Sequence, residues 1–130
     1  MSQIFHLAIP THDIALSEDF YTRVIGAQRA RIYDDRVTFK FFDHQIVCHL
    51  APDEIDKSVK MYPRHFGMTF IEKAEFDKLY QKCLESGYPF FQERTMRWPE
   101  RPEKHETFFI ADPSNNLLEF KYYLDSKYAY

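Results

Sequence analysis

The sequence predicts an α+β fold built from two βαβββ modules. Its 130 residues, 45% of them apolar, are enough for one compact domain with a buried core. Short apolar runs of strand length alternate with two helical patterns, and the order strand, helix and three strands occurs twice. We therefore expect a single domain over residues 1–130, with repeat 1 at about 3–52, a linker at 53–62 and repeat 2 at about 63–124.

The first repeat opens with an apolar strand at about residues 4–9, which is expected to end at Pro10. Thr11, His12 and Asp13 offer caps for a helix that runs from Ile14 until Gly26 stops it. Two pairs typical of tight turns, Asp34-Asp35 and Asp43-His44, separate the strands that follow. These three strands are predicted at about 28–33, 36–42 and 45–50.

The second repeat shows the same order after a polar stretch. A strand is expected at 65–71, followed by a helix at 74–86 that ends at Gly87. Prolines at 99 and 102 lengthen one hairpin loop, and an Asp-Pro turn precedes the last strand. The remaining strands are predicted at about 90–97, 106–111 and 117–123.

Composition narrows the classes of function. The formal net charge of −3 gives no basic footprint for nucleic acid, and the chain has only 3 glycines and neither phosphate-binding glycine motif. Cys48 and Cys83 lack the C-x-x-C spacing and are expected to be buried, reduced thiols. Because no long apolar run or signal-like start occurs, we expect a cytoplasmic protein with no membrane partner.

Histidines and one glutamate fall at matching places in the two repeats. His6 and His65 lie in the first strand of each repeat, and His49 and Glu119 lie in the last strand, so we expect two equivalent pairs. Imidazole and carboxylate ligands suit a borderline divalent metal, and two His with one carboxylate leave coordination positions open. Strand alternation places Glu119 on the face opposite Leu118 and Phe120.

Each of these residues also has a structural interpretation. A single His in an apolar strand is more often a hydrogen-bonded core residue than a ligand. Glu119 is equally open to pairing with Lys121 or with an Arg of a neighbouring strand. His105 lies at a hairpin edge, where solvent exposure and a role in acid–base chemistry are both open.

The chain resembles the vicinal oxygen chelate superfamily, which includes glyoxalases, extradiol dioxygenases, fosfomycin-resistance thiol transferases and bleomycin-binding proteins. The segments that carry the resemblance extend over nearly the whole chain. They are Phe5–Pro10, Phe41–Leu50, Pro63–Gly67 and Asp112–Lys121. Within the superfamily, the chain looks closest to small single-domain predicted dioxygenases of the extradiol type.

The resemblance implies a cleft lined by curved mixed sheets that form an incomplete barrel. It places His6, His65 and Glu119 at the metal-ligand positions, and His49 where glyoxalase-like members have a fourth ligand. For a dioxygenase the metal would be Fe(II), with Mn, Ni or Zn as alternatives. The substrate would be a small, catechol-like molecule that chelates the metal beside O₂, with His49 or His105 as acid–base groups. A homodimer is also implied.

Departures from the extradiol pattern keep other functions open. Phe109 stands where that family has a Tyr before the Asp-Pro turn, and His105 lies too close to Phe109 to match the family's His. A glyoxalase-like lyase or isomerase, a thiol transferase and a metal-free binding protein are the alternatives. The long hairpin loop is preceded by Arg94, Arg97 and Trp98. These residues could close over a cleft, where Arg97 could bind an anionic substrate. Alternatively, they form a solvated hairpin.

Overall fold

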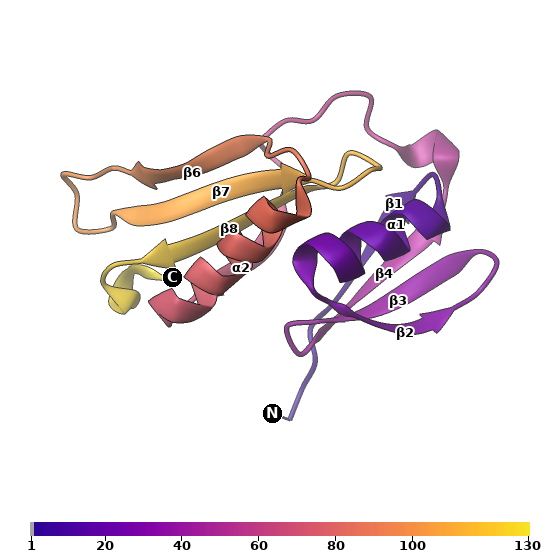
Figure 1. Cartoon of the computed structure of the whole chain (residues 1–130), viewed down its shortest axis with the longest axis horizontal. Coiled ribbons are helices and arrows are strands. Elements are labelled where there is room, and N and C mark those ends of the chain that lie inside the picture. The colour runs from indigo at the N-terminus through magenta and orange to yellow at the C-terminus, as the bar shows by residue number, and fades with distance from the viewer. Residues whose placement is uncertain (1) are drawn as a thin grey trace. The chain divides into compact units, whose positions relative to one another are not determined.

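A computed structural model describes residues 2–130 and separates them into two compact units (Figure 1). Of the described residues, unit 1 comprises 2–59 together with 112–116, and unit 2 comprises 60–111 together with 117–130. Each unit contains one four-stranded mixed sheet and one principal helical segment.

The sheet of unit 1 has the strand order β1-β4-β3-β2. Strand β1 pairs with β4 in parallel, and β4 with β3 and β3 with β2 are antiparallel pairs. The bounds of these strands are β1 His6–Thr11, β2 Gln28–Ile32, β3 Arg36–Phe41 and β4 His44–Leu50.

The sheet of unit 2 repeats this topology in the order β5-β8-β7-β6. Its first strand again pairs in parallel with its last, and the other pairs are antiparallel. The bounds are β5 Phe66–Phe70, β6 Gln92–Arg97, β7 His105–Ala111 and β8 Leu117–Tyr123. The expectation of an α+β fold from two βαβββ modules is therefore confirmed, whereas the single-domain boundaries stay a prediction.

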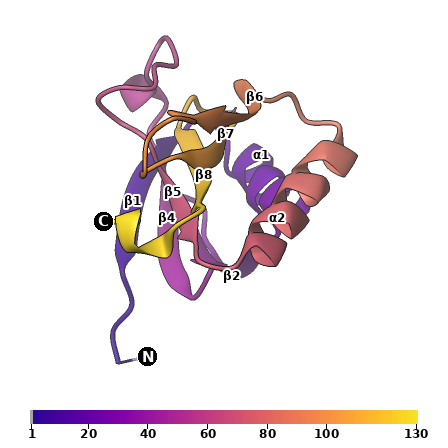
Figure 2. The same ribbon diagram turned by 90° about the vertical axis from the view of Figure 1, so that its left-hand side faces the viewer.

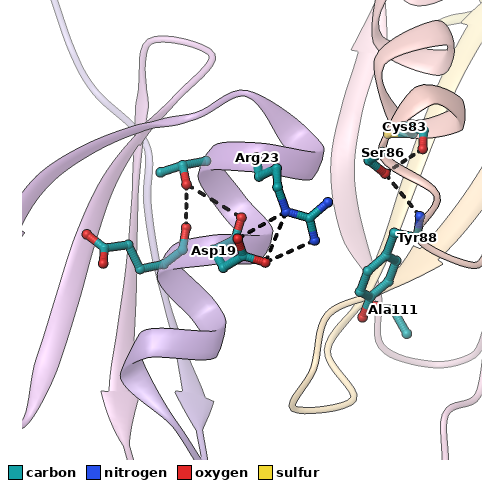
Figure 3. A network of polar contacts seen from close by, with 8 residues as sticks. Asp19, Arg23, Cys83, Ser86, Tyr88 and Ala111 are labelled. Carbon is teal, nitrogen blue, oxygen red and sulfur yellow. Dashed lines mark hydrogen bonds and ion pairs between the residues drawn. The ribbon is translucent and has the colours of Figure 1, made fainter.

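The helical segment of unit 1 begins as predicted but changes its hydrogen-bonding pattern midway. Asp13 caps α1 (Ile14–Asp19) by accepting a hydrogen bond from the Leu16 N–H at 3.0 Å. The chain continues as a π-helix, η1 (Phe20–Ile25), and ends at Gly26 in the left-handed conformation, with φ of 88°. Across this junction Arg23 binds Asp19 at 3.0 Å (Figure 3) and holds the pKa of that carboxyl below its ordinary value.

The helix of unit 2, α2 (Lys73–Ser86), ends at Gly87, whose φ is 74°. The chain after it is held by short polar contacts (Figure 3). The Ser86 hydroxyl donates to the Cys83 carbonyl at 2.6 Å and accepts from the Tyr88 N–H, and the Tyr88 hydroxyl donates to the Ala111 carbonyl at 2.7 Å. These contacts attach the C-terminal end of α2 to the end of β7.

Helix α2 lies against β5 and β8 on one face of its sheet (Figures 1 and 2). Its Phe76 ring lies 5.6 Å from that of Phe108 and 6.2 Å from that of Tyr122. Because successive strand residues alternate between faces, Phe108 and Phe120 point toward α2 while Glu119 points away from it. The face of this sheet opposite α2 therefore carries Glu119, and we call it the helix-distal face.

Some predicted boundaries and environments need correction. Strand β1 does not end at Pro10 but continues to Thr11. Proline is tolerated there because β1 is an edge strand of its sheet, where a missing N–H costs no ladder bond on the open side. His65 lies just before β5 rather than in it, and His44 belongs to β4 rather than to a turn.

The two cysteines are buried thiols, as predicted. Burial raises the pKa of Cys48 and of Cys83 to about 12, so neither is a reactive thiolate near neutral pH. Among residues 2–130, no helix has the length and apolar character needed to cross a membrane.

Arg94 is part of the packing of α2 and does not close over a cleft. Its guanidinium binds Glu106 at 2.8 Å and Asp77 at 2.7 Å, and it stacks 4.8 Å from the centre of the Phe76 ring. The side chain is only 20% exposed. This arrangement joins α2 to β6 and β7.

Arg94→Lys is expected to lower the free energy of unfolding by about 1–2 kcal/mol, because an ammonium cannot stack and bridge two carboxylates at once. Urea denaturation of the variant measures this loss. Arg101→Lys is the control, since the Arg101 guanidinium lies over the face of the exposed Trp98 ring. An equal loss in both variants would contradict the role of Arg94.

Candidate metal centre

The helix-distal face of the unit 2 sheet carries polar side chains of β7 and β8. Directly opposed residues share a face, and Glu119 is opposite Phe109 on one side and Gly67 on the other. Thr107 is opposite Lys121 by the same register. This alternation confirms the predicted facing of Glu119 and gives it neighbours on β5 and β7.

His65 and Glu119 meet at the edge of this face. The His65 Nε2 atom lies 3.1 Å from Glu119 Oε1, with side chains that are 24% and 10% exposed. The His65 ring also makes edge contacts with the rings of Tyr62 and Phe109. A carboxylate at this depth requires a partner, and an imidazole supplies it here.

Each partner of the pair is oriented by a second contact. His65 Nδ1 lies 2.6 Å from the Met61 carbonyl oxygen, and the Thr107 hydroxyl donates to Glu119 Oε2 at 2.6 Å. Thr107 is fully buried. Such outer contacts fix the ring orientation of a ligating histidine and the rotamer of a ligating carboxylate.

The Met61 contact also decides which nitrogen is left for a ligand. A carbonyl oxygen only accepts, so Nδ1 must carry the proton of the neutral ring. Nε2 then presents a lone pair toward Glu119 Oε1, which is itself an acceptor. Two acceptors at this distance are stable only around a cation, either a proton on Nε2 or a metal ion. The donor set therefore fits a borderline divalent metal.

The third predicted ligand, His6, is the exposed first residue of β1 and belongs to unit 1. In residues 2–130, His, Cys, Asp and Glu side chains do not gather in a group of three or more that could hold a metal. Within unit 2, His65 and Glu119 meet as a pair. The convergence of His6 with this pair stays a prediction.

The expected equivalence of His49 and Glu119 is wrong. Gly67, two residues after His65, pairs with Glu119, whereas Ala8, two residues after His6, pairs with Val47. Val47 thus holds the place of Glu119 in unit 1, because the strand register shifts His49 two positions further along. His49 is exposed and opposite Pro10, ~13 Å along the strand from the level of His6. Its role as a fourth ligand or acid–base group stays a prediction without this positional support.

His105 is buried rather than exposed at a hairpin edge, with only 4% of its surface accessible. Its ring packs on Tyr123 at 4.6 Å and on Trp98, and Nδ1 lies 3.1 Å from the Glu103 carbonyl. It shares the helix-distal face with Glu119 but lies four residues along β7 from the partner of Glu119, ~13 Å away. Its acid–base role stays a prediction.

Three residues that support the pair were not identified from the sequence. Met61 acts through its backbone carbonyl, which no side-chain pattern reveals. Thr107 could have been found, because strand alternation puts it on the same face as a cross-strand Glu. Gly67 is required because a Cβ there would fall on the backbone carbonyl of Glu119, so only glycine lets β5 approach β8 this closely.

Comparison with known proteins identifies the family of this chain. Residues 3–120 match the family model of the Glyoxalase/Bleomycin resistance protein/Dioxygenase superfamily. A solved glyoxalase/bleomycin resistance protein/dioxygenase from Alicyclobacillus acidocaldarius is 50% identical, with a TM-score of 0.95 over 99% of this chain and 97% of that one.

Two more distant structures share the fold. Lactoylglutathione lyase from Agrobacterium tumefaciens is 23% identical, with a TM-score of 0.69 over 94% of both chains. The fosfomycin resistance protein FosX from Listeria monocytogenes is 14% identical, with a TM-score of 0.74 over 98% of both chains.

The two βαβββ modules and the match to the family model define a protein of the vicinal oxygen chelate class. The chain belongs to the glyoxalase/bleomycin resistance protein/dioxygenase superfamily.

Proposed function

We propose that this protein is a divalent-metal-dependent enzyme of the extradiol dioxygenase type, which acts on a small molecule with vicinal oxygens. His65 and Glu119 supply two ligands, and His6 supplies the third, as the family resemblance implies. The observation that carries the proposal is the approach of His65 Nε2 to Glu119 Oε1 at 3.1 Å. The Met61 carbonyl orients the imidazole, and the Thr107 hydroxyl orients the carboxylate.

The protein's own residues do the orienting in this proposal. Met61 holds the proton on Nδ1 of His65 and so keeps Nε2 available as a donor of electrons. Thr107 keeps the second oxygen of Glu119 in a hydrogen bond, which leaves Oε1 to bind. A bound Fe(II) held by two His and one carboxylate would supply open positions at which vicinal oxygens and O₂ are activated.

A second candidate is a glyoxalase-like lyase or isomerase, or a thiol transferase, that uses the same centre with Mn, Ni or Zn. The observation that favours it is the lack of extradiol proton-handling groups at the expected places. Phe109, rather than a Tyr, is opposite Glu119, and His105 is buried ~13 Å along the strands. A metal-free binding protein is disfavoured, because it would have no use for an oriented pair of metal-ligand type.

Elemental analysis of protein purified anaerobically without added metal tests the proposal. We expect about one divalent metal per chain, and its absence under all loading conditions would refute the metal-dependent function. The loaded protein is then tested in two assays, O₂ uptake with a panel of catechols and isomerisation of a hemithioacetal. Turnover in the first supports the dioxygenase, and turnover only in the second supports the lyase or isomerase.

Thr107→Val is expected to weaken metal binding by about 10–100-fold, because it removes the hydrogen bond behind Glu119 without changing the volume of the side chain. Titration with Mn²⁺ or Co²⁺ measures the change. Thr107→Ser, which keeps the hydroxyl, should restore binding, and Thr95→Val on the neighbouring strand should have no effect. Unchanged affinity in Thr107→Val would show that Thr107 has no positioning role.

A further inference from the structure

Two cations on the helix-distal face of the unit 2 sheet have no carboxylate partner among the described residues 2–130. They are Arg97 at the end of β6 and Lys121 in β8, and both are half-buried. Arg97 is opposite His105 and Lys121 is opposite Thr107, so both share the face of Glu119. Partly desolvated cations normally attract an anion, and here residues 2–130 supply none.

Arg97 is only weakly engaged by its neighbours. Its Nη1 donates to the Tyr62 hydroxyl at 3.2 Å, and its Nη2 reaches Met61 Sδ and Gln92 Oε1, each at 3.5 Å. In the described part of the chain, Nε has no hydrogen-bond partner. Every fully buried polar side-chain atom does have one, so Nε is accessible. The fork of the guanidinium is thus available for a bidentate oxyanion.

Arg97 is also close to the His65–Glu119 pair. Its guanidinium carbon lies 6.0 Å from the centre of the Phe109 ring, and the His65 ring lies 5.6 Å from the same centre. Met61 joins the two residues as well, because its sulfur contacts Arg97 and its carbonyl contacts His65. A small molecule bound at His65 and Glu119 is therefore within reach of Arg97.

Lys121 lies beside Glu119 in the same strand. It is two residues along β8 on the same face, ~7 Å away, and it makes no ion pair with Glu119. Its ammonium contacts the Tyr123 hydroxyl at 3.4 Å and the face of the Tyr123 ring, which leaves donors available. The alternative in which Glu119 pairs with Lys121 or with an Arg of a neighbouring strand is therefore wrong, because His65 and Thr107 contact the carboxylate instead.

Arg94 provides an internal comparison. It lies three residues before Arg97 in the same strand, and two carboxylates neutralise it on the α2 side of the sheet. Where a cation of this sheet has a structural role, the chain thus provides its counter-charge. The helix-distal face instead carries two positive charges against the single carboxylate of Glu119.

We propose that the substrate carries an oxyanion, a carboxylate or phosphate group, which Arg97 binds through its guanidinium fork with Lys121 as a second cation. This inference rests on the proposed function, because it assigns the remainder of the substrate to the His65–Glu119 centre. The substrate is then an anionic small molecule, and Arg97 is the residue that selects against neutral analogues.

The test uses NMR titration of the ¹⁵N-labelled metal-free protein, in which the arginine Nε–H signals report binding. The probes are benzoate, phenyl phosphate and benzamide, which is the neutral analogue of benzoate. We expect both anions to bind and to shift the Arg97 signal, and benzamide to bind at least about 10-fold more weakly. The anion that binds more tightly identifies the oxyanion of the substrate as a carboxylate or a phosphate. Arg97→Gln should weaken anion binding by about 10–100-fold, and Lys121→Gln by less.

Arg101→Gln is the matched control, since it removes the same charge from an exposed residue of the hairpin loop that follows β6. It should leave anion binding unchanged. Equal binding of benzoate and benzamide, or equal losses in Arg97→Gln and Arg101→Gln, would overturn the proposal. A separate metal titration of Arg97→Gln should match the wild type, and a wild type that binds anions but no metal would refute only the metal-dependent function.

Discussion

Replacing His65 with alanine is expected to reduce bound metal from about one ion per chain to none. The change removes an imidazole whose Nδ1 is held by Met61 and whose Nε2 faces Glu119. The remaining carboxylate is hydrogen-bonded to Thr107 and would have lost its nearest nitrogen partner. Metal analysis after purification, followed by a Mn²⁺ or Co²⁺ titration, measures the loss.

The fold should survive this substitution. His65 lies just outside β5 and is partly exposed, its ring makes edge contacts, and Thr107 still donates to Glu119 when His65 is removed. We therefore expect the free energy of unfolding to change by about 1 kcal/mol or less. His44→Ala is the matched control, because it removes an imidazole of unit 1 that is not a predicted ligand and should leave stoichiometric binding intact. Full metal retention in His65→Ala would remove this residue from the centre.

The periodic spacing of apolar residues was sufficient to predict the fold from the sequence. The strand–helix–three-strand order, the helix stops at Gly26 and Gly87 and the facing of Glu119 all follow from side-chain spacing and backbone preferences. These are local properties. The same is true of the Asp13 cap, which needs only its own helix.

The register between paired strands could not be predicted from local sequence patterns. The match between His49 and Glu119 seemed natural because both lie in a last strand, but the parallel pairing of first and last strands aligns Val47 with Glu119. Parallel pairing joins segments distant in sequence, so its register cannot be predicted from local patterns. A register shift of two residues leaves every side chain on the same face of the sheet, and the pattern of apolar residues therefore does not reveal it. Arg94 and Arg97 illustrate the opposite case, because their odd spacing places them on opposite faces of β6.

Asp112→Ala is expected to lower the free energy of unfolding by about 3–5 kcal/mol, the other large effect. Asp112 is 2% exposed and accepts four hydrogen bonds within unit 1. The Ser114 and Asn116 N–H groups bind Oδ1, while the Tyr21 hydroxyl and the Asn116 amide bind Oδ2, at 2.8–3.0 Å. Alanine would leave all these donors without an acceptor, and Tyr21 is fully buried.

A double-mutant cycle separates the hydrogen bonds from the loss of packing. Tyr21→Phe removes one donor, so Asp112→Ala should cost at least about 1 kcal/mol less in that background than in the wild type. Urea denaturation of the four proteins gives the coupling. Additive losses would mean that Asp112 acts through the local turn alone, where it also binds the Ser114 and Asn116 N–H groups. A clear coupling would show that this turn stabilises unit 1 through the buried Tyr21 hydroxyl, so that residues distant in sequence fold as one unit.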